Sequence, residues 1–428
     1  MNNTATIHPL THPIDVRVTI PGSKSFSNRA LIIASLAKGT STLHGVSNAN
    51  DTVILIRLLT KLGIEITSKG DITTVKGNSG KFNSFNGELD VEDAGTVMRF
   101  LSALCCLIPG EIILKGSERM HQRPIGGLAE ALKQLGGNVT YAGKESFPPI
   151  KIQAGNLNGK TIHVDASQSS QFVSALLMVA PILQNDIEII CDGTITSLPY
   201  IDMTLAVMKH FGVEIKHEGY KHYFVKGGQS YKASEYNIEA DASSSTYLLA
   251  LAALTGSSVE ILNLSFNSLQ GDAGFANILA NMGCKVEKGN TIKVMGTNEL
   301  KAVNVDMAGM PDAAQTLAVL AAFAKGESTI TGLNTLEHKE TDRMNALQTE
   351  LYRMNIESWI DNSTIRIKGG EPKSAFINTY GDHRMAMAFA VAGTKIHGIS
   401  IESSEVVKKS FPTFWNTLTS IGVKVEFK

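Results

Sequence analysis

The 428-residue chain is almost neutral, with 39 Lys and Arg against 40 Asp and Glu, and 43% of its residues are hydrophobic. These values are typical of a well-buried globular protein of two or three domains. A chain without a basic tail or charge block is not expected to bind nucleic acid or an anionic membrane. Its longest apolar stretches, such as 175–183, are shorter than the roughly 18 residues of a membrane helix. The first ten residues lack the basic and apolar regions of a secretory signal, so we expect a cytoplasmic protein.

The first predicted element is a helix that begins near Gly22, where a small polar cluster precedes an apolar run, GSKSFSNRALIIASLA. The same pattern recurs about every 70 residues, as expected of an internal structural repeat. Its later copies begin, in chain order, at Asp93, Asp165, Asp241, Asp312 and Asp382. Each polar cluster is typical of a helix N-cap region, because short oxygen-bearing side chains accept hydrogen bonds from the first turn.

A second helix follows in each repeat and ends in an apolar residue, a glycine and a short strand, as in LLTKLGIEI. The turn positions are Gly63, Gly136, Gly212, Gly283, Asn355 and Gly422. Gly and Asn are the residues that most readily adopt the left-handed conformation that closes a helix. We therefore expect all six positions to have positive φ.

Each repeat reads helix, strand, helix, strand, strand, with a buried first helix and an amphipathic second helix. This pattern predicts an α/β fold of two domains, each built of three repeats. The domains are expected to comprise residues 1–20 with 241–428, and residues 21–240.

Basic residues collect where the helices of the repeat begin. Helix N-termini bind phosphate and carboxylate groups through free N–H donors, so such a set predicts a small polyanionic ligand. The residues are Lys24, Arg29, Arg99, Arg123, Lys339, Arg343, His383, Arg384 and Lys409, with Glu340 among them. Any one of these residues, taken alone, could equally well be a surface charge or a helix cap as a ligand-binding residue.

Three other classes of site are disfavoured by the local patterns. PGSKS lacks the upstream glycine of a phosphate-binding loop of nucleotide triphosphatases. The Ser-rich strings have no His or Cys paired with them and are typical of caps rather than nucleophiles. Four cysteines in apolar surroundings, without metal-ligand spacing, are expected to be free buried thiols: Cys105, Cys106, Cys191 and Cys284.

At these same residues the sequence resembles the enolpyruvyl transferases, and among them the 5-enolpyruvylshikimate-3-phosphate synthases. The resemblance covers essentially the whole chain. It rests on eight strings in order: PGSKSFSNRAL at Pro21, DAGTVMRF at Asp93, RPIG at Arg123, SSQF at Ser169, PYID at Pro199, PDAAQT at Pro311, KETDR at Lys339 and YGDHRMAM at Tyr380.

The resemblance implies two domains of three βαβαββ units, an inside-out arrangement like an α/β barrel, with the active site in the cleft between them. It implies that shikimate 3-phosphate is bound by Lys24, Ser25, Arg29, Ser169, Ser170, Gln171, Ser197, Tyr200, Asp312 and Lys339. It implies that phosphoenolpyruvate is bound by Lys24, Gly95, Arg123, Gln171, Glu340, Arg343, His383, Arg384 and Lys409.

The implied reaction moves the enolpyruvyl group of phosphoenolpyruvate to the 5-hydroxyl of shikimate 3-phosphate through a tetrahedral intermediate. By resemblance, Glu340 is the returning acid and base, Asp312 the base near the hydroxyl, and Lys24 shares proton and charge roles. No cofactor or metal is expected, the partners are these two small molecules, and the protein is expected to be a monomer and a target of glyphosate.

The chain departs from the common pattern at Phe100, Asp93 and Thr335, where Pro, Asn and Asn are frequent. Two alternatives remain open. A UDP-N-acetylglucosamine enolpyruvyl transferase shares the architecture, but that family carries Lys-Asn where this chain has Lys24 and Ser25. A non-catalytic repeat scaffold would explain the period but not the cations and carboxylates at the helix starts.

Overall fold

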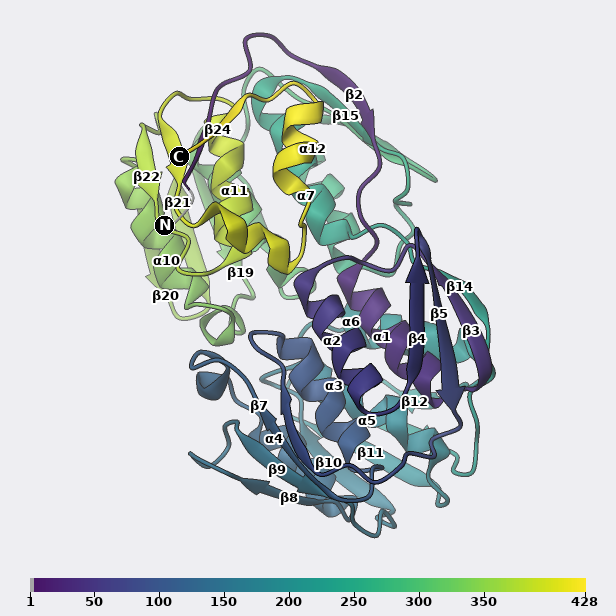
Figure 1. Cartoon of the computed structure of the whole chain (residues 1–428). Coiled ribbons are helices and arrows are strands. Elements are labelled where there is room, and N and C mark those ends of the chain that lie inside the picture. The colour runs from purple at the N-terminus through teal and green to yellow at the C-terminus, as the bar shows by residue number, and fades with distance from the viewer. Residues whose placement is uncertain (1–3) are drawn as a thin grey trace. The chain divides into compact units, whose positions relative to one another are not determined.

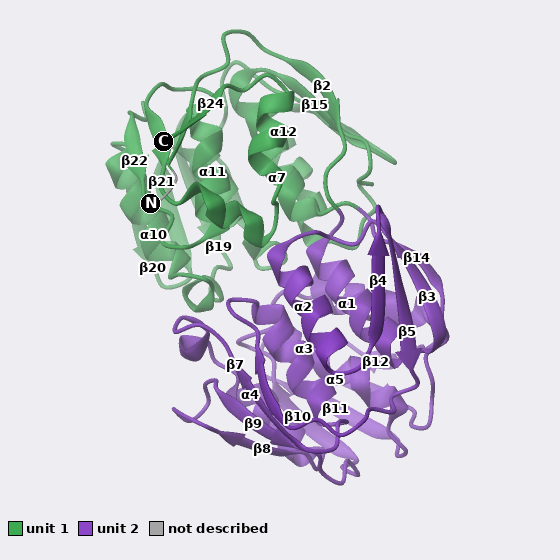
Figure 2. Cartoon of the chain, in the orientation of Figure 1, with its two compact units in different colours: residues 1–21, 240–428 green, residues 22–239 purple. Residues whose placement is uncertain are grey.

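The computed structural model describes residues 4–428 and divides into two compact units. Unit 1 comprises residues 1–21 and 240–428, and unit 2 comprises residues 22–239 (Figure 2). The chain crosses between them twice, once after Pro21 and once after Glu239. Each unit has its own hydrophobic core, so each is a folding unit in its own right.

Unit 2 contains three four-stranded sheets, with strand orders β14-β3-β5-β4, β6-β7-β9-β8 and β10-β11-β13-β12 (Figure 1). The strands are β3 (Lys38–His44), β4 (Glu65–Lys69), β5 (Ile72–Asn78), β6 (Gly87–Asp90), β7 (Glu111–Lys115), β8 (Asn138–Tyr141), β9 (Ile150–Gln153), β10 (Thr161–Asp165), β11 (Ile187–Asp192), β12 (Lys216–Glu218), β13 (His222–Val225) and β14 (Glu235–Asn237). The helices are α1 (Lys24–Leu36), α2 (Asn50–Lys61), α3 (Gly95–Cys105), α4 (Gly126–Gln134), α5 (Ser170–Val179) and α6 (Pro199–His210).

Unit 1 repeats this plan, with sheets β2-β15-β17-β16, β18-β19-β21-β20 and β22-β23-β1-β24. The strands are β1 (Ala5–Ile7), β2 (Asp15–Val18), β15 (Ser258–Ile261), β16 (Lys285–Lys288), β17 (Ile292–Met295), β18 (Asn304–Asp306), β19 (Glu327–Thr331), β20 (Glu357–Asp361), β21 (Thr364–Lys368), β22 (Ala375–Ile377), β23 (Ile399–Ile401) and β24 (Val425–Phe427). The helices are α7 (Ala242–Thr255), α8 (Phe275–Asn281), α9 (Ala314–Ala322), α10 (Arg343–Arg353), α11 (His383–Gly393) and α12 (Phe414–Ser420).

Every sheet combines one parallel pair with two antiparallel pairs. In one example, β6 runs parallel to β7, with Leu89 opposite Leu114, and β7 and β8 both run antiparallel to β9. A helix joins the two parallel strands, as a parallel connection requires. The βαβαββ repeat expected from the sequence is therefore the observed unit of the fold.

The N-terminal strands complete two sheets of unit 1. β1 lies between β23 and β24, antiparallel to both, and Ala5 pairs with Ile401 and Phe427. β2 runs parallel to β15, with Val16 opposite Val259. Two of the three sheets in this unit therefore depend on residues that are distant in sequence.

The first helix of each repeat is buried, as the apolar patterns predict. All residues of α3, α9 and α11 are buried, and in α7 every residue before Thr255 is buried. The second helices bury one face only, as α2 does through Ile54, Leu55, Leu58 and Leu59. This difference places the first helices in the core and the second helices at the surface of each unit.

All six turn positions have positive φ, as expected from the sequence. The five glycines range from 87° at Gly212 to 104° at Gly283, and Asn355 has φ 64°. The single Asn is thus a substitution that the left-handed backbone tolerates.

The prediction of an N-cap in each polar cluster is confirmed for α1, α5, α7 and α11, where Ser23 and Ser169 cap the first two, and is wrong for α3 and α9. Asp241 and Asp382 cap α7 and α11 by accepting from backbone N–H groups. Asp93, Asp165 and Asp312 do not cap helices. Asp165 ends strand β10 and holds the following turn, so that Ser169 caps α5 instead, while Asp312 lies in the short η4 turn (Pro311–Ala313) and pairs with arginines.

Two further findings concern membrane-spanning helices and the cysteines. No helix within residues 4–428 is both long and apolar enough to cross a membrane. All four cysteines are free and buried, as expected, and burial raises the pKa of the Cys106 and Cys191 thiols to about 12.

Candidate active site

Arg343 is the centre of a buried ionic network in unit 1. It is the first residue of α10 and is 1% exposed. Its Nη1 lies 3.0 Å from Asp312 Oδ1, its Nη2 lies 2.9 Å from Glu340 Oε2, and its Nε lies 2.7 Å from Asp382 Oδ2. The guanidinium thereby fixes the positions of three carboxylates at once.

Burial alone lowers the pKa of Arg343, but the carboxylates of Asp382, Glu340 and Asp312 raise it above its ordinary value. The arginine therefore stays charged and is a shared counter-ion of all three carboxylates. Asp312 and Glu340 share this one cation, so their protonation states are coupled.

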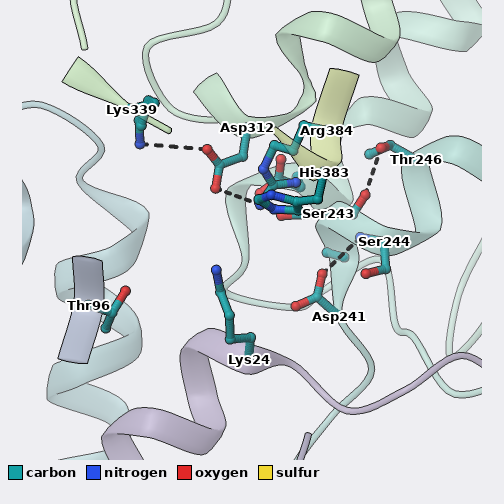
Figure 3. Close-up of polar contacts among 12 residues, drawn as sticks. Lys24, Thr96, Asp241, Ser243, Ser244, Thr246, Asp312, Lys339, His383 and Arg384 are labelled. Atoms are coloured by element: carbon teal, nitrogen blue, oxygen red, sulfur yellow. Dashed lines mark hydrogen bonds and ion pairs between the residues drawn. The ribbon is translucent and has the colours of Figure 1, made fainter. Parts of the chain in front are cut away.

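Arg384 is a second buried arginine beside the network. It lies in the first turn of α11, its Nη2 lies 2.8 Å from Asp312 Oδ2, and its Nη1 donates to the Tyr247 hydroxyl at 3.2 Å (Figure 3). Asp382 Oδ1 accepts from the backbone N–H of Arg384 and so fixes the start of the helix. Contacts from α11 to α7 and η4 bring three helix starts of this unit together, as expected from the repeat.

Lys339, Lys409 and His383 surround these carboxylates. Lys339 Nζ lies 3.6 Å from Asp312 Oδ1, and Lys409 Nζ lies 3.7 Å from Glu340 Oε1 (Figure 3 shows the former). His383 is buried, with Nδ1 3.4 Å from Asp382 Oδ1. All seven predicted site residues of unit 1 thus belong to one cluster.

In unit 2, Arg29 is held almost entirely by neutral oxygens. Its guanidinium donates to Thr204 Oγ1 at 2.7 Å and to the carbonyls of Ser25 and Tyr200 at 2.9 Å, with Ser174 Oγ at 3.4 Å. Burial lowers the pKa of this arginine to about 10. A buried cation held without a carboxylate among these contacts is suited to an anionic ligand.

Lys24 and Gln171 are each oriented by a neighbour in unit 2. Lys24, the first residue of α1, has Nζ 3.1 Å from Asp51 Oδ2. Gln171 Nε2 donates to Thr96 Oγ1 at 3.2 Å, which links the first turns of α5 and α3. Ser169 Oγ accepts from the backbone N–H of Gln171, so Ser169 acts here as the cap of α5.

Gly95 lies directly against a predicted ligand-binding arginine. A Cβ atom at this position would lie 2.5 to 2.7 Å from the guanidinium atoms of Arg123. The Arg123 side chain also donates to the Asp93 carbonyl at 3.4 Å. Only glycine leaves the guanidinium in this place, which explains the residue type in DAGTVMRF.

The remaining predicted residues of unit 2 lie at the starts of α1, α5 and α6. Ser25 follows Lys24, and Ser170 is the first residue of α5 and 4% exposed. Ser197 has φ 55° in the turn before α6, and Tyr200 is the second residue of that helix. Tyr200 also lies against Arg29, with 5.9 Å between the Arg29 Cζ and the ring centroid.

The three departures from the family pattern have definite places. Phe100 is buried beneath Arg29, whose Cζ lies 5.3 Å from the ring centroid. The Asp93 carboxylate accepts a hydrogen bond from Ser117 Oγ. Thr335 is 8% exposed and precedes the η5 turn (Leu336–His338). Phe100 therefore adds a cation–π contact to Arg29, a predicted site residue of unit 2.

Sequence reasoning missed residues that contact the predicted site residues and orient them. Asp51, Thr204 and Tyr247 each contact a predicted residue but lie outside the strings that carry the resemblance. Only Asp382 had a visible signal, because it lies within YGDHR and precedes the helix. Among residues 4–428, no group of three or more His, Cys, Asp or Glu side chains is placed to hold a metal ion.

Comparison with known proteins identifies relatives of the whole chain. Residues 10–418 match the family model described as EPSP synthase (3-phosphoshikimate 1-carboxyvinyltransferase). A 3-phosphoshikimate 1-carboxyvinyltransferase of Sulfurovum sp. (strain NBC37-1) is 43% identical over 98% of this chain and 99% of that protein. One from Escherichia coli O1:K1 / APEC is 41% identical over 97% and 98%.

A solved structure of EPSP synthase from Acinetobacter baumannii matches with a TM-score of 0.84 at 24% identity, covering 100% of both chains. A second structure of EPSP synthase from the same organism matches with a TM-score of 0.82 over 99% of both chains. These likenesses confirm the α/β fold expected from the sequence.

Proposed function

Because the chain belongs to the EPSP synthase family, we propose that it transfers the enolpyruvyl group of phosphoenolpyruvate to the 5-hydroxyl of shikimate 3-phosphate, releasing phosphate. The observation that carries this assignment within the structure is the pairing of Arg343 with both Asp312 and Glu340. It places two carboxylates, suited to two proton transfers, among cations suited to a phosphorylated acid.

We propose substrate-binding roles for residues of each unit. In unit 2, Arg29 and the serines at the starts of α1 and α5 would bind shikimate 3-phosphate, since helix starts and a buried arginine suit a phosphate group. In unit 1, Arg343, Arg384 and Lys409 would bind phosphoenolpyruvate. The full sets are those that the resemblance implies, Lys24, Gly95, Arg123, Gln171 and His383 included.

The chemistry needs proton transfer in both directions. A proton adds to the methylene carbon of phosphoenolpyruvate while the 5-hydroxyl oxygen bonds to the neighbouring carbon and loses its own proton. Loss of a methyl proton and departure of phosphate then restore the double bond. Glu340 would give and retake the first proton, Asp312 would accept the hydroxyl proton, and Lys24 would assist near the phosphate.

Support for these roles comes from the electrostatics of unit 1. Arg343 contacts both Asp312 and Glu340, and Lys339 and Lys409 lie beside these carboxylates as further cations. Approach of an anionic substrate would draw these cations toward the substrate and make the carboxylates better bases. The reaction as proposed requires no cofactor.

The test is turnover by the purified full chain. With shikimate 3-phosphate and phosphoenolpyruvate together, we expect one phosphate released for each enolpyruvyl group transferred, and none when either substrate is omitted. Turnover with UDP-N-acetylglucosamine in place of shikimate 3-phosphate would favour the alternative transferase. Binding without turnover of any acceptor would contradict the assignment.

We also propose that the protein acts as a monomer in the cytoplasm, with no nucleic acid or membrane partner. Light scattering of the purified chain at working concentration is expected to give the mass of one chain. A concentration-independent dimer would contradict the monomer.

A further inference from the structure

Asp272 is a buried carboxyl that the proposed reaction does not use. It lies in the η3 turn (Gly271–Gly274) and is 3% exposed. Its Oδ2 accepts from Ser243 Oγ at 3.1 Å, while its buried Oδ1 has no hydrogen-bond partner within residues 4–428. A buried carboxylate with a single hydrogen bond is unfavourable, so its presence needs a reason.

The η3 turn, which carries Asp272, is fixed to the start of α7. Gln270, which precedes the turn, donates from Nε2 to the Ala240 carbonyl at 2.7 Å. Its Oε1 accepts from the Ala242 N–H at 3.1 Å. Both hydrogen bonds are buried, so the backbone on either side of Asp241 holds the turn in place.

The same face of α7 holds Asp272 and Arg384. Ser243, which binds Asp272, and Tyr247, which binds Arg384, are four residues apart and therefore neighbours on one face of the helix. The η3 turn also packs toward the segment that carries Asp312, because a Cβ on Gly274 would lie 3.1 Å from Met310 Cε. Asp272 and Arg384 are therefore bound by the same face of α7, through Ser243 and Tyr247.

The charges that face Asp272 come from several elements. Asp312 of η4 and Asp241 at the cap of α7 repel its ionised form, while Arg384 of α11 and the Ser243 hydroxyl stabilise that form. Tyr247 is the titratable residue of α7, and α8 carries none. Burial, followed by the charge of Asp312, raises the pKa of Asp272 to about 7.

We propose that Asp272 is a positioning residue for phosphoenolpyruvate that acts through Arg384, and this proposal rests on the proposed function. A protonated Asp272 leaves the Arg384 guanidinium to Asp312 and to the incoming anion. An ionised Asp272 adds a second carboxylate that competes for the same guanidinium and repels the anion. The strength of substrate binding then depends on whether this buried carboxyl holds its proton.

The kinetic test measures KM and kcat for phosphoenolpyruvate between pH 6 and pH 8.5 in wild type and Asp272→Asn. Asn retains the shape of the protonated acid and can still accept from Ser243. We divide the wild-type KM by the KM of the variant at each pH. This ratio is expected to increase by about 5-fold or more from pH 6 to pH 8.5, which is the lower end of the usual coupling between two sites. The corresponding ratio of kcat is expected to change much less, and KM for shikimate 3-phosphate should not follow the trend.

Two further variants sharpen this test. Ser243→Ala removes the hydrogen bond that favours the ionised form, so the rise in KM should move to higher pH. Asp306→Asn is the control, because it removes one negative charge as Asp272→Asn does, but from an exposed carboxylate at the end of β18. Its KM for phosphoenolpyruvate should depend on pH as in the wild type. An unchanged pH profile in Asp272→Asn would overturn the inference. A loss of kcat that is the same at every pH would also overturn it, since that result indicates a merely structural role.

A measurement without substrate separates this inference from the proposed function. In the full-length protein, the ¹⁵Nε resonance of Arg384 is expected to titrate with a midpoint near neutral pH in wild type but not in Asp272→Asn. If the enzyme turns over but this titration is missing, the inference about Asp272 is wrong. If the titration is present but no turnover is found, the coupling stands and the proposed function fails.

Discussion

At the scale of single residues, one arginine couples the two carboxylates to which we assign proton transfer. Arg343 contacts both Asp312 and Glu340 while being almost fully buried. Removing either carboxylate side chain would leave part of a buried charge without its counter-ion, which destabilises proteins markedly. Amide variants keep the hydrogen-bond acceptor and therefore isolate the chemistry.

Glu340→Gln and Asp312→Asn are each expected to lower kcat by about 10² or more, the usual scale for loss of a general acid or base. Steady-state turnover with both substrates measures the effect. Glu357→Gln on strand β20 removes an exposed carboxylate and should retain wild-type kcat. If either site variant turned over at the wild-type rate, that residue would have no part in proton transfer.

Gly95→Ala tests the close approach of Arg123. The added methyl would lie 2.5 Å from Arg123 Nη2, so the guanidinium must move. We expect KM for phosphoenolpyruvate to rise and the inhibition constant of glyphosate, the longer molecule, to rise further. One methyl group changes binding by about 10- to 200-fold, which sets the scale of the larger effect.

The matched control for this variant is Gly143→Ala in the same unit, where the nearest atom lies at an ordinary 3.5 Å and both constants should be unchanged. Both constants are obtained from inhibition kinetics at varied phosphoenolpyruvate. An equal rise of the two constants in Gly95→Ala would contradict this prediction and show that the methyl acts only by displacing Arg123, on which both ligands depend.

At the scale of elements, the left-handed turn at Gly63, between the second helix and its strand, is set by the backbone rather than by packing. Gly63 has φ 92° and no atom within 4 Å of where its Cβ would be, whereas Asn355 holds the equivalent position at φ 64°. Any loss in the free energy of unfolding when Gly63 is replaced by a residue with a side chain therefore comes from the backbone conformation.

Gly63→Ala is expected to lower the free energy of unfolding by about 1–2 kcal/mol, the cost of a left-handed conformation for an L-residue. Asn355→Gly should change it by only a few tenths, because both residues adopt this conformation. Urea denaturation followed by circular dichroism measures both. Equal and large losses in the two variants would show that side-chain contacts, not φ, control these turns.

Sequence patterns were most reliable where the local backbone decides the outcome. The six turns and the buried first helices could be predicted because Gly, Asn and apolar runs have few alternative conformations. The polar clusters at Asp93 and Asp312 were wrongly predicted to cap helices, because distant partners bind those carboxylates: Asp93 accepts from Ser117, and Asp312 pairs with Arg343 and Arg384. Asp51, Tyr247 and Asp272 could not be found for the same reason, since tertiary contacts alone bring them to the site.

At the scale of the whole molecule, the two units differ in how the chain builds them. Unit 2 is continuous from 22 to 239, whereas unit 1 needs residues from both ends of the chain. In unit 1, β1 is a central strand between β23 and β24, so its absence would leave two strands without their shared neighbour.

A fragment of residues 22–239 is expected to fold alone, with dispersed amide resonances and a cooperative thermal transition. A fragment of residues 240–428 should remain partly folded until a peptide of residues 1–21 is added. Circular dichroism and amide NMR spectra of the two fragments provide the measurement. A fully cooperative 240–428 fragment without the peptide would show that β1 and β2 are dispensable.

The place of β1 also fixes an order of events on the ribosome. Ala5 is synthesised more than 400 residues before its partner Phe427. Chains are made at about 5–20 residues per second, so the first strand waits tens of seconds for its sheet. During that time residues 22–239 emerge and can complete their own core. The segment that carries β1 and β2 must therefore stay unpaired while residues 22–239 fold. Polar and apolar residues alternate in its second strand, β2 (DVRV), which suits a strand that waits in solvent.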